Sequence, residues 1–389
     1  MFESLKFWLP AASGMVCLAL SAGLIGIYGF FVEPLSQEFG VGVAILNMGP
    51  VALLLVPGII APFVGKLADR LPIRRVVLFG VSLAMFSLMA ISQAPTLQLV
   101  ALGFIVCVIG LTGYGPVVIN GLMVKLYPGR EARSLAIVAI GISLATATLP
   151  PVVGIMLETM SWRATLLTLA VVLMVLLWLA VLLSFPNQVV ERAKIATPQA
   201  EGFHRKREFW LIGWCVALAF NASIVVAITY PPYFMSVGYS AAEAGGFLSF
   251  AGICGLLGKT TIAWLGDKSN RYVKWLAVGL LLMQALGLSL LLLQDSLAGI
   301  FLAVGLMGFS GGAFIPMHPF LNSQYFDNAI ISEVNGAQMP LFLPFGLVGA
   351  PLAGYAYDQT GNYELVHAAL ACAVCIAAVI LLRLPSAQK

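Results

Sequence analysis

Long apolar stretches alternate with short polar ones along almost the entire chain. A helix needs about 20 apolar residues to cross the hydrocarbon core of a bilayer, and twelve stretches reach roughly that length. They cover residues 8–32, 44–64, 76–92, 97–124, 134–157, 164–184, 210–234, 241–265, 273–293, 297–321, 334–356 and 364–384. One longer polar stretch separates the first six from the last six. The pattern predicts an all-α membrane protein with a six-helix bundle over 1–185, a cytoplasmic linker over 186–208 and a second six-helix bundle over 209–389.

The sparse charges support this prediction and orient the chain. Only 9% of the 389 residues are charged and 61% are hydrophobic, whereas a soluble domain carries about 25% charged residues. If both termini are cytoplasmic, every lysine and arginine except Arg163 and Lys259 falls on the cytoplasmic side, as the positive-inside rule requires. We therefore expect a multi-pass protein of the plasma (inner) membrane. The net charge of +4 then reflects topology, and no nucleic-acid partner is expected.

The two halves of the sequence match at a nearly constant offset. When 198 is added to the residue number, several residues of the first half match residues of the same type in the second half. The matching pairs are Pro34 and Pro232, Gly40 and Gly238, and Asp69 and Asp267. The same shift carries Asn120 onto His318. Farther along, an offset of 200 carries Pro151 and Gly154 onto Pro351 and Gly354. Two six-helix halves of this kind form a parallel repeat, which in transporters places the substrate site near mid-membrane between pseudo-symmetric halves.

One loop carries a family signature. The stretch "GKLADRLPIRRVV" (65–77) resembles the loop between the second and third spans of the major facilitator superfamily, in its monocarboxylate transporter and oxalate/formate antiporter-like branch. The matching positions are Gly65, Asp69, Arg70, Arg74 and Arg75, while Pro72 replaces a usual glycine. The second half keeps a degenerate copy, "GDKSNRYVK", which contains Asp267. The resemblance implies the major facilitator fold and assigns these charged positions to a gate.

Two interpretations of this loop remain open. In the family, the loop acid is thought to pair across to the other half and to hold one conformation. A carboxylate is also stabilised near a helix N-terminus, where unpaired N–H groups point. Alternatively, the charges only set topology, although an acid among cytoplasmic basic residues contributes nothing to that rule. We expect Asp69 to act in gating.

Lys259 lies inside the eighth predicted span, where a charge is costly and usually faces a cavity or a partner. Gly252 and Gly255 share its helix face, and small residues there either allow close helix packing or leave room for a ligand. The resemblance aligns Lys259 with a basic residue thought to bind the substrate carboxylate. Relatives carry an aspartate where Gly255 stands, so proton coupling is in doubt. The alternative is a lysine whose stem lets the ammonium reach the membrane interface.

Other polar side chains within the spans are candidate substrate contacts. His318 lies between two prolines and can titrate near neutral pH, or it can bond a carbonyl freed by the prolines. Asn120, Tyr28 and Tyr114 are further candidates, although polar groups in membrane helices equally often link helices. Arg163, in "SWRATLL", resembles a common outer-end element and is expected to be structural.

The predicted function is secondary active transport of a small organic anion, a monocarboxylate, by alternating access. Proton symport is one open coupling mode. An exporter of drug-like or hydrophobic solutes is one alternative, and a membrane sensor that does not transport is another. The six cysteines lie in apolar runs and are expected to stay reduced. No catalytic or metal-ligand motif is visible, so we expect no enzyme activity, no cofactor and no metal, and a monomer in contact with membrane lipid.

Overall fold

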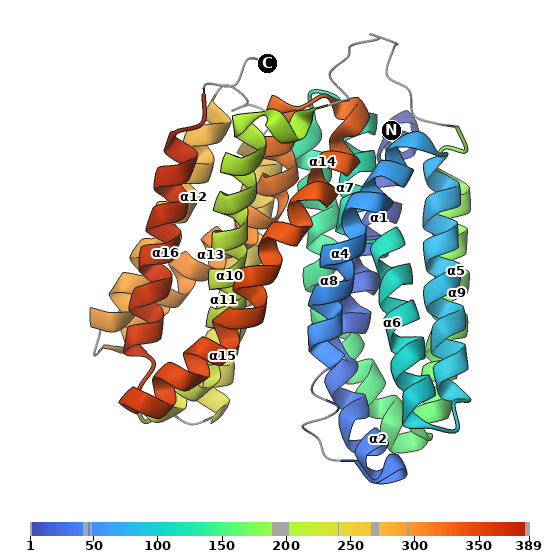
Figure 1. The fold of residues 1–389 in the computed structure, drawn as a ribbon, viewed down its shortest axis with the longest axis horizontal. Coiled ribbons are helices and arrows are strands. Elements are labelled where there is room, and N and C mark those ends of the chain that lie inside the picture. The colour runs from blue at the N-terminus through green and yellow to red at the C-terminus, as the bar shows by residue number, and fades with distance from the viewer. Residues whose placement is uncertain are drawn as a thin grey trace. The chain divides into compact units, whose positions relative to one another are not determined.

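The computed structural model describes residues 2–41, 46, 49–188, 202–239, 241–265, 272–293 and 296–385. Every regular element in these ranges is a helix (Figure 1). Twelve of the described helical segments are long and apolar enough to cross a membrane. The predicted all-α fold of twelve membrane helices is therefore confirmed. Asp267 and most of the predicted linker lie outside the described residues.

The chain divides into two compact units. The first contains most of the elements coloured blue to green in Figure 1. They are α1 (Phe2–Gly26), η1 (Tyr28–Phe31), α2 (Val32–Phe39), α4 (Gly49–Arg70), α5 (Ile73–Ser92), α6 (Leu97–Gly113), α7 (Pro116–Leu126), most of α8 (Glu131–Thr159) and α9 (Trp162–Ser184). To these the fold adds η5 (Asn328–Ile330) and α14 (Ile331–Gln338), which come from far along the sequence.

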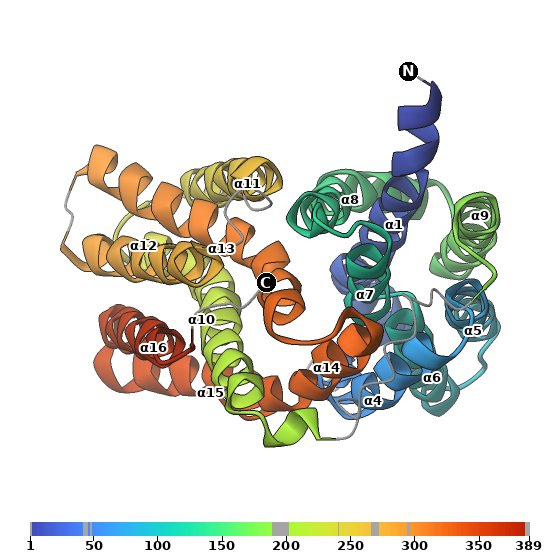
Figure 2. The same ribbon diagram turned by 90° about the horizontal axis from the view of Figure 1, so that it is seen from above.

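The second unit holds most of the remaining helices. They are η3 (Phe203–Arg205), α10 (Arg207–Ser236), α11 (Ala241–Leu265), α12 (Val273–Leu293), α13 (Leu297–Tyr325), α15 (Leu343–Thr360) and α16 (Glu364–Leu382), with η6 (Met339–Phe342) leading into α15. Within this unit α11 runs along α13 (Figure 2). Both α11 and α12 have the bounds that hydropathy predicts.

Two short segments exchange between the units. Asn328–Met339 groups with the first unit, and Gly129–Ala136 groups with the second. Subtracting the repeat offset of 200 from 329–336 gives 129–136, so the exchanged segments are equivalent positions of the repeat. The compact units therefore differ at these segments from a simple division into sequence halves. The domain boundaries at 185 and 209 stay a prediction.

Among the described residues, three predicted spans are broken rather than continuous. In the first, predicted over 8–32, α1 ends at Gly26 and the chain continues as η1. The fourth ends its first helix at Gly113 and restarts at Pro116. Proline suits the first helical position because the amide hydrogen it lacks would be unpaired there. The eleventh span turns through η6, which contains Pro340. By contrast, α13 continues through Pro316 and Pro319 without ending.

Glycines allow the closest helix contacts. In the first unit, Gly80 of α5 lies against Gly110 and Gly113 of α6, where added Cβ atoms would meet backbone atoms. In the second, Gly308 and Gly312 of α13 lie against the backbone of α11 in the same way. Small residues let membrane helices approach closely and gain van der Waals contact. This packing positions the polar residues of α11.

Candidate gating and binding sites

The side chain of Asp69 joins three helices of the first unit. It stands one residue before the end of α4, and its side chain is only 4% exposed. Lys125 of α7 donates to its Oδ1 at 2.6 Å. The backbone N–H of Glu333, in the first turn of α14, donates to its Oδ2 at 2.7 Å. The carboxylate therefore uses both oxygens, one on a cation and one on a helix end.

Asp69 caps α14 from another element. The first N–H groups of a helix have no partner within the helix, and the N-cap residue of α14, Ile330, supplies no capping side chain. The carboxylate of Asp69 fills that role and also lies at the positive end of the helix dipole. Hydrogen bonds to an ionised carboxylate are shorter and stronger than neutral ones. The residues at the start of α14 thus provide no capping side chain, and Asp69 of α4 provides one instead.

Close approach of α14 depends on glycines. A Cβ atom on Gly65 would clash with the carbonyl oxygen of Ser332, and one on Gly121 would clash with the Ser332 hydroxyl. On α14 itself, a Cβ on Gly336 would clash with the carbonyl oxygen of Ala61. The helix therefore rests directly on the backbones of α4 and α7 (Figure 1). This contact brings the Glu333 amide within reach of Asp69.

Of the predicted gating residues, the structure brings Gly65 and Asp69 to α14. Arg74 instead donates from Nε to the Phe185 carbonyl at the end of α9, at 2.7 Å. Arg70 and Arg75 are exposed.

Sequence analysis did not select Lys125 or Glu333. Lys125 had a detectable signal, because adding 198 gives Ser323, so its charge has no counterpart in the other half. The contribution of Glu333 is a backbone N–H, for which the side chain gives no signal.

Lys259 is buried in the second unit. It lies on α11, six residues before that helix ends, and is 4% exposed. The glycine one turn earlier, Gly255, lies against Gly308 of α13, and a Cβ on Gly258 would clash with the Phe309 carbonyl oxygen. Gly252 has open space beside it. The glycines near Lys259 were expected either to allow close helix packing or to leave room for a ligand. Gly255 allows close packing on α13, and open space lies beside Gly252.

His318 is also buried, with 5% exposure, in the part of α13 that contains the prolines. Its Nε2 lies 3.1 Å from the Nδ2 of Asn322, one turn farther along the helix. An amide nitrogen only donates, so His318 accepts in this arrangement. The ring also meets Phe342 edge-on, with centroids 6.1 Å apart. Asn120 is half-buried on α7.

The two tyrosine candidates lie in apolar surroundings. Tyr28 donates to the Leu46 carbonyl at 2.5 Å, and its ring lines an apolar cavity of about 250 Å³. Tyr114 follows α6, is fully buried, and its hydroxyl has no hydrogen-bond partner among the described residues. Contact with a polar substrate therefore stays a prediction for both.

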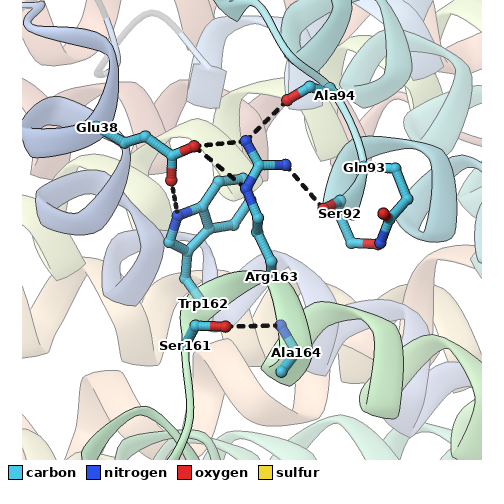
Figure 3. Close-up of polar contacts among 8 residues, drawn as sticks. All are labelled: Glu38, Ser92, Gln93, Ala94, Ser161, Trp162, Arg163 and Ala164. Carbon is cyan, nitrogen blue, oxygen red and sulfur yellow. Dashed lines mark hydrogen bonds and ion pairs between the residues drawn. The ribbon is translucent and has the colours of Figure 1, made fainter.

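Arg163 ties together elements at one end of the first unit (Figure 3). Its guanidinium donates to Glu38 of α2 and to the carbonyl oxygens of Ser92 and Ala94, the latter two at 2.8 Å. Trp162 donates from Nε1 to the other Glu38 oxygen at 2.6 Å. These hydrogen bonds, those from Arg163 first, lower the pKa of Glu38 below its ordinary value. The geometry is that of a structural clamp between α2, α5 and α9.

Twelve apolar helices in two units define a multi-pass integral membrane protein. The chain belongs to the Major Facilitator Superfamily, whose family model matches residues 14–342. It is 26% identical over 349 residues to human (Homo sapiens) monocarboxylate transporter 12, covering 78% of this chain and 66% of that protein. It is 24% identical over 375 residues to monocarboxylate transporter 13 of Rattus norvegicus, covering 92% and 83% of the two chains. The resemblance inferred from residues 65–77 is therefore confirmed.

A solved structure shows the same fold. The transporter FucP in its outward conformation superposes with a TM-score of 0.73 at 16% identity, covering 97% of this chain and 98% of that one. At this identity the likeness extends to the fold alone. The chain spans about two thirds of the length of human monocarboxylate transporter 12.

Proposed function

We propose that this protein is a secondary active transporter that moves a small monocarboxylate across the plasma (inner) membrane, with both termini in the cytoplasm. The observation that carries the choice of an anion is Lys259, a cation buried to 4% exposure within a membrane helix. Membership of the superfamily supports transport, and relatives named monocarboxylate transporters support the substrate class. The relatives are distant, so the substrate rests on the chemistry of this chain.

Lys259 acts as the counter-charge for the substrate carboxylate. A buried ammonium costs several kcal/mol unless a partner or a water-filled cavity compensates it. An anion that binds beside it forms a charge-assisted hydrogen bond, which is roughly twice as strong as a neutral one. Gly252, on the same helix face two turns before Lys259, has open space beside it. A single cation suits one carboxylate better than two.

The Asp69 cap acts as a gate. It holds α14, from the second half of the sequence, on α4 and α7. Alternating access requires an element with two discrete arrangements, and a cap that forms in one arrangement and opens in the other provides it. Lys125 keeps the carboxylate charged and oriented while the cap is formed. The cap therefore stabilises one end state of the cycle.

Transport assays on the purified protein test this proposal. The protein is reconstituted into liposomes, and uptake of labelled carboxylates of increasing size is measured with and without a pH gradient. We expect uptake of a monocarboxylate above that of dicarboxylates, competed by unlabelled substrate. Uptake or efflux of uncharged hydrophobic solutes without any carboxylate transport would favour the exporter alternative. Specific carboxylate binding with no uptake under any gradient would favour a sensor.

A further inference from the structure

The first unit contains an apolar cavity that the proposed transport mechanism does not use. Its volume is about 250 Å³, and its walls come from α1, η1, α2, α4, α5, α6 and α9. The lining side chains are almost all aliphatic or aromatic, and none is charged. The Tyr28 hydroxyl, which is polar, is already bonded to the Leu46 carbonyl. The cavity therefore offers hydrocarbon surface and little else.

Water is a poor occupant for such a space. A buried water needs two to four polar partners, and apolar cavities stay dry. An engineered apolar cavity of about 150 Å³ binds benzene, and this one is larger. A hydrocarbon segment would gain burial against the leucine and phenylalanine walls without leaving a polar group unpaired.

The cavity reaches the surface beside α6. Two lining residues of that helix, Ala101 and Ile105, are exposed, the latter to 41%. Neighbouring α6 residues on the surface are apolar as well, since Leu99 is 49% and Leu102 is 58% exposed. The opening is therefore bordered by apolar side chains on a helix long and apolar enough to cross a membrane, a surface suited to bilayer hydrocarbon.

Helix α2 covers another side of the cavity. Its Leu35, together with Phe31 of η1, contributes to the lining. The helix is held by Glu38, which accepts from Trp162 and Arg163 at the start of α9. The polar clamp lies on α2 outside the lining, so charged groups are kept away from the interior. This arrangement favours entry of a hydrocarbon chain beside α6.

We propose that this cavity binds the end of an acyl chain of a bilayer phospholipid. The site differs from the proposed anion site in ligand chemistry, because it has no cation and an apolar lining. Because no charged group lines the cavity, recognition depends on the hydrocarbon chain and not on the headgroup. Phosphatidylcholine and phosphatidylglycerol with the same chains should therefore bind alike.

Photo-crosslinking in a bilayer tests the site. The full-length protein is placed in nanodiscs that contain phosphatidylcholine with a diazirine near the end of one chain, and adducts are mapped by peptide mass spectrometry. We expect adducts on lining residues such as the half-buried Leu53 and the buried Cys107. Ala101→Trp fills the opening and should reduce these adducts by at least about tenfold, because several buried methylene groups lose their contacts. Leu102→Trp, on the exposed face of the same helix, is the matched control and should leave them unchanged.

A second measurement uses the wild-type protein, so the test does not depend on the folding of a variant. Excess unlabelled decane should compete with adducts at Leu53 and Cys107 while sparing adducts on exposed residues such as Leu102. Adducts confined to exposed residues, or cavity adducts insensitive to both Ala101→Trp and decane, would overturn the proposal. Labelling by a diazirine fatty acid but not by the phospholipid would also refute it, because the occupant would then be a free fatty acid.

Discussion

At the scale of single residues, the carboxylate of Asp69 carries the clearest functional chemistry. Asp69→Asn keeps the shape of the side chain but removes the charge that Lys125 and the end of α14 require. The asparagine oxygen can still cap α14, so the main loss is the ion pair, which leaves the nearly buried ammonium of Lys125 without its counter-charge. We expect a lower transport rate with substrate affinity unchanged within a few-fold, measured as maximal rate and KM of uptake.

The neighbouring residue provides the control for Asp69. The cap uses the backbone N–H of Glu333, so Glu333→Gln should transport like the wild type. If Asp69→Asn loses substrate affinity but keeps its maximal rate, Asp69 belongs to substrate binding and the gating interpretation is wrong.

Lys259 gives the second residue-scale prediction. Lys259→Ala removes a charge-assisted contact to the substrate, which contributes on the order of 2–3 kcal/mol. At about 1.4 kcal/mol per decade, anion affinity should fall by about 30- to 150-fold. Lys259→Arg should keep partial function, because charge matters before fork geometry. Substrate binding to the purified variants measures the effect.

A half-buried lysine on α12 separates this effect from a general loss of charge. Lys274 donates to the carbonyl oxygens of Leu382 and Leu384, so Lys274→Ala should leave anion affinity unchanged. If Lys259→Ala binds the anion with wild-type affinity but shows reduced expression or stability, the alternative role is supported. In that role the lysine stem lets the ammonium reach the membrane interface.

At the scale of elements, α2 depends on the clamp at Glu38. The lowered pKa of Glu38 means that the folded protein binds this proton less readily than the unfolded chain does. The clamp therefore contributes stability above the unfolded pKa of about 4.5, and loses it as the pH falls through the lower, folded value. Glu38 is 39% exposed, so the contribution is small, about 0.2–1 kcal/mol.

Thermal unfolding in detergent measures this contribution. Glu38→Gln should unfold at a lower temperature than the wild type at neutral pH, and the difference should shrink as the pH falls below about 4.5. Glu158→Gln, an exposed residue at the end of α8, is the control and should not differ. A Glu38→Gln effect that is constant across this range would exclude the charge of Glu38 as its source.

At the scale of the whole molecule, the open question is how transport is driven. His318 lies within a membrane helix between two prolines, and it is the candidate proton site in α13. If protons are coupled, His318→Gln should abolish accumulation driven by a pH gradient but spare exchange of labelled for unlabelled substrate. Glutamine keeps a polar group beside Asn322 but does not titrate. Uptake into liposomes with an imposed pH gradient measures both activities.

The exposed His204 of η3 supplies the comparison, and His204→Gln should accumulate substrate normally. Normal pH-driven accumulation in His318→Gln would remove His318 from the mechanism. In that case the substrate gradient or exchange with another anion would drive transport.

The sequence alone predicted the helices and the family correctly because hydropathy and a contiguous motif are local properties. The bounds of α11 and α12 follow from apolar length, and Asp69 was recognised within "GKLADRLPIRRVV". A carboxylate is stabilised near a helix N-terminus, but the sequence does not say which helix Asp69 meets, because the amide of Glu333 is 264 residues away along the chain.

Only the tertiary structure decided what each candidate side chain contacts. Gly255, a neighbour of Lys259 on one helix face, turned out to pack on α13, and Tyr28 was found to line an apolar cavity. Lys125 became significant only when α7 was seen beside α4. Periodicity gives the face of a helix, but the element that covers this face is set by packing between distant segments. That packing placed α14 against the first unit and made Asp69 its cap.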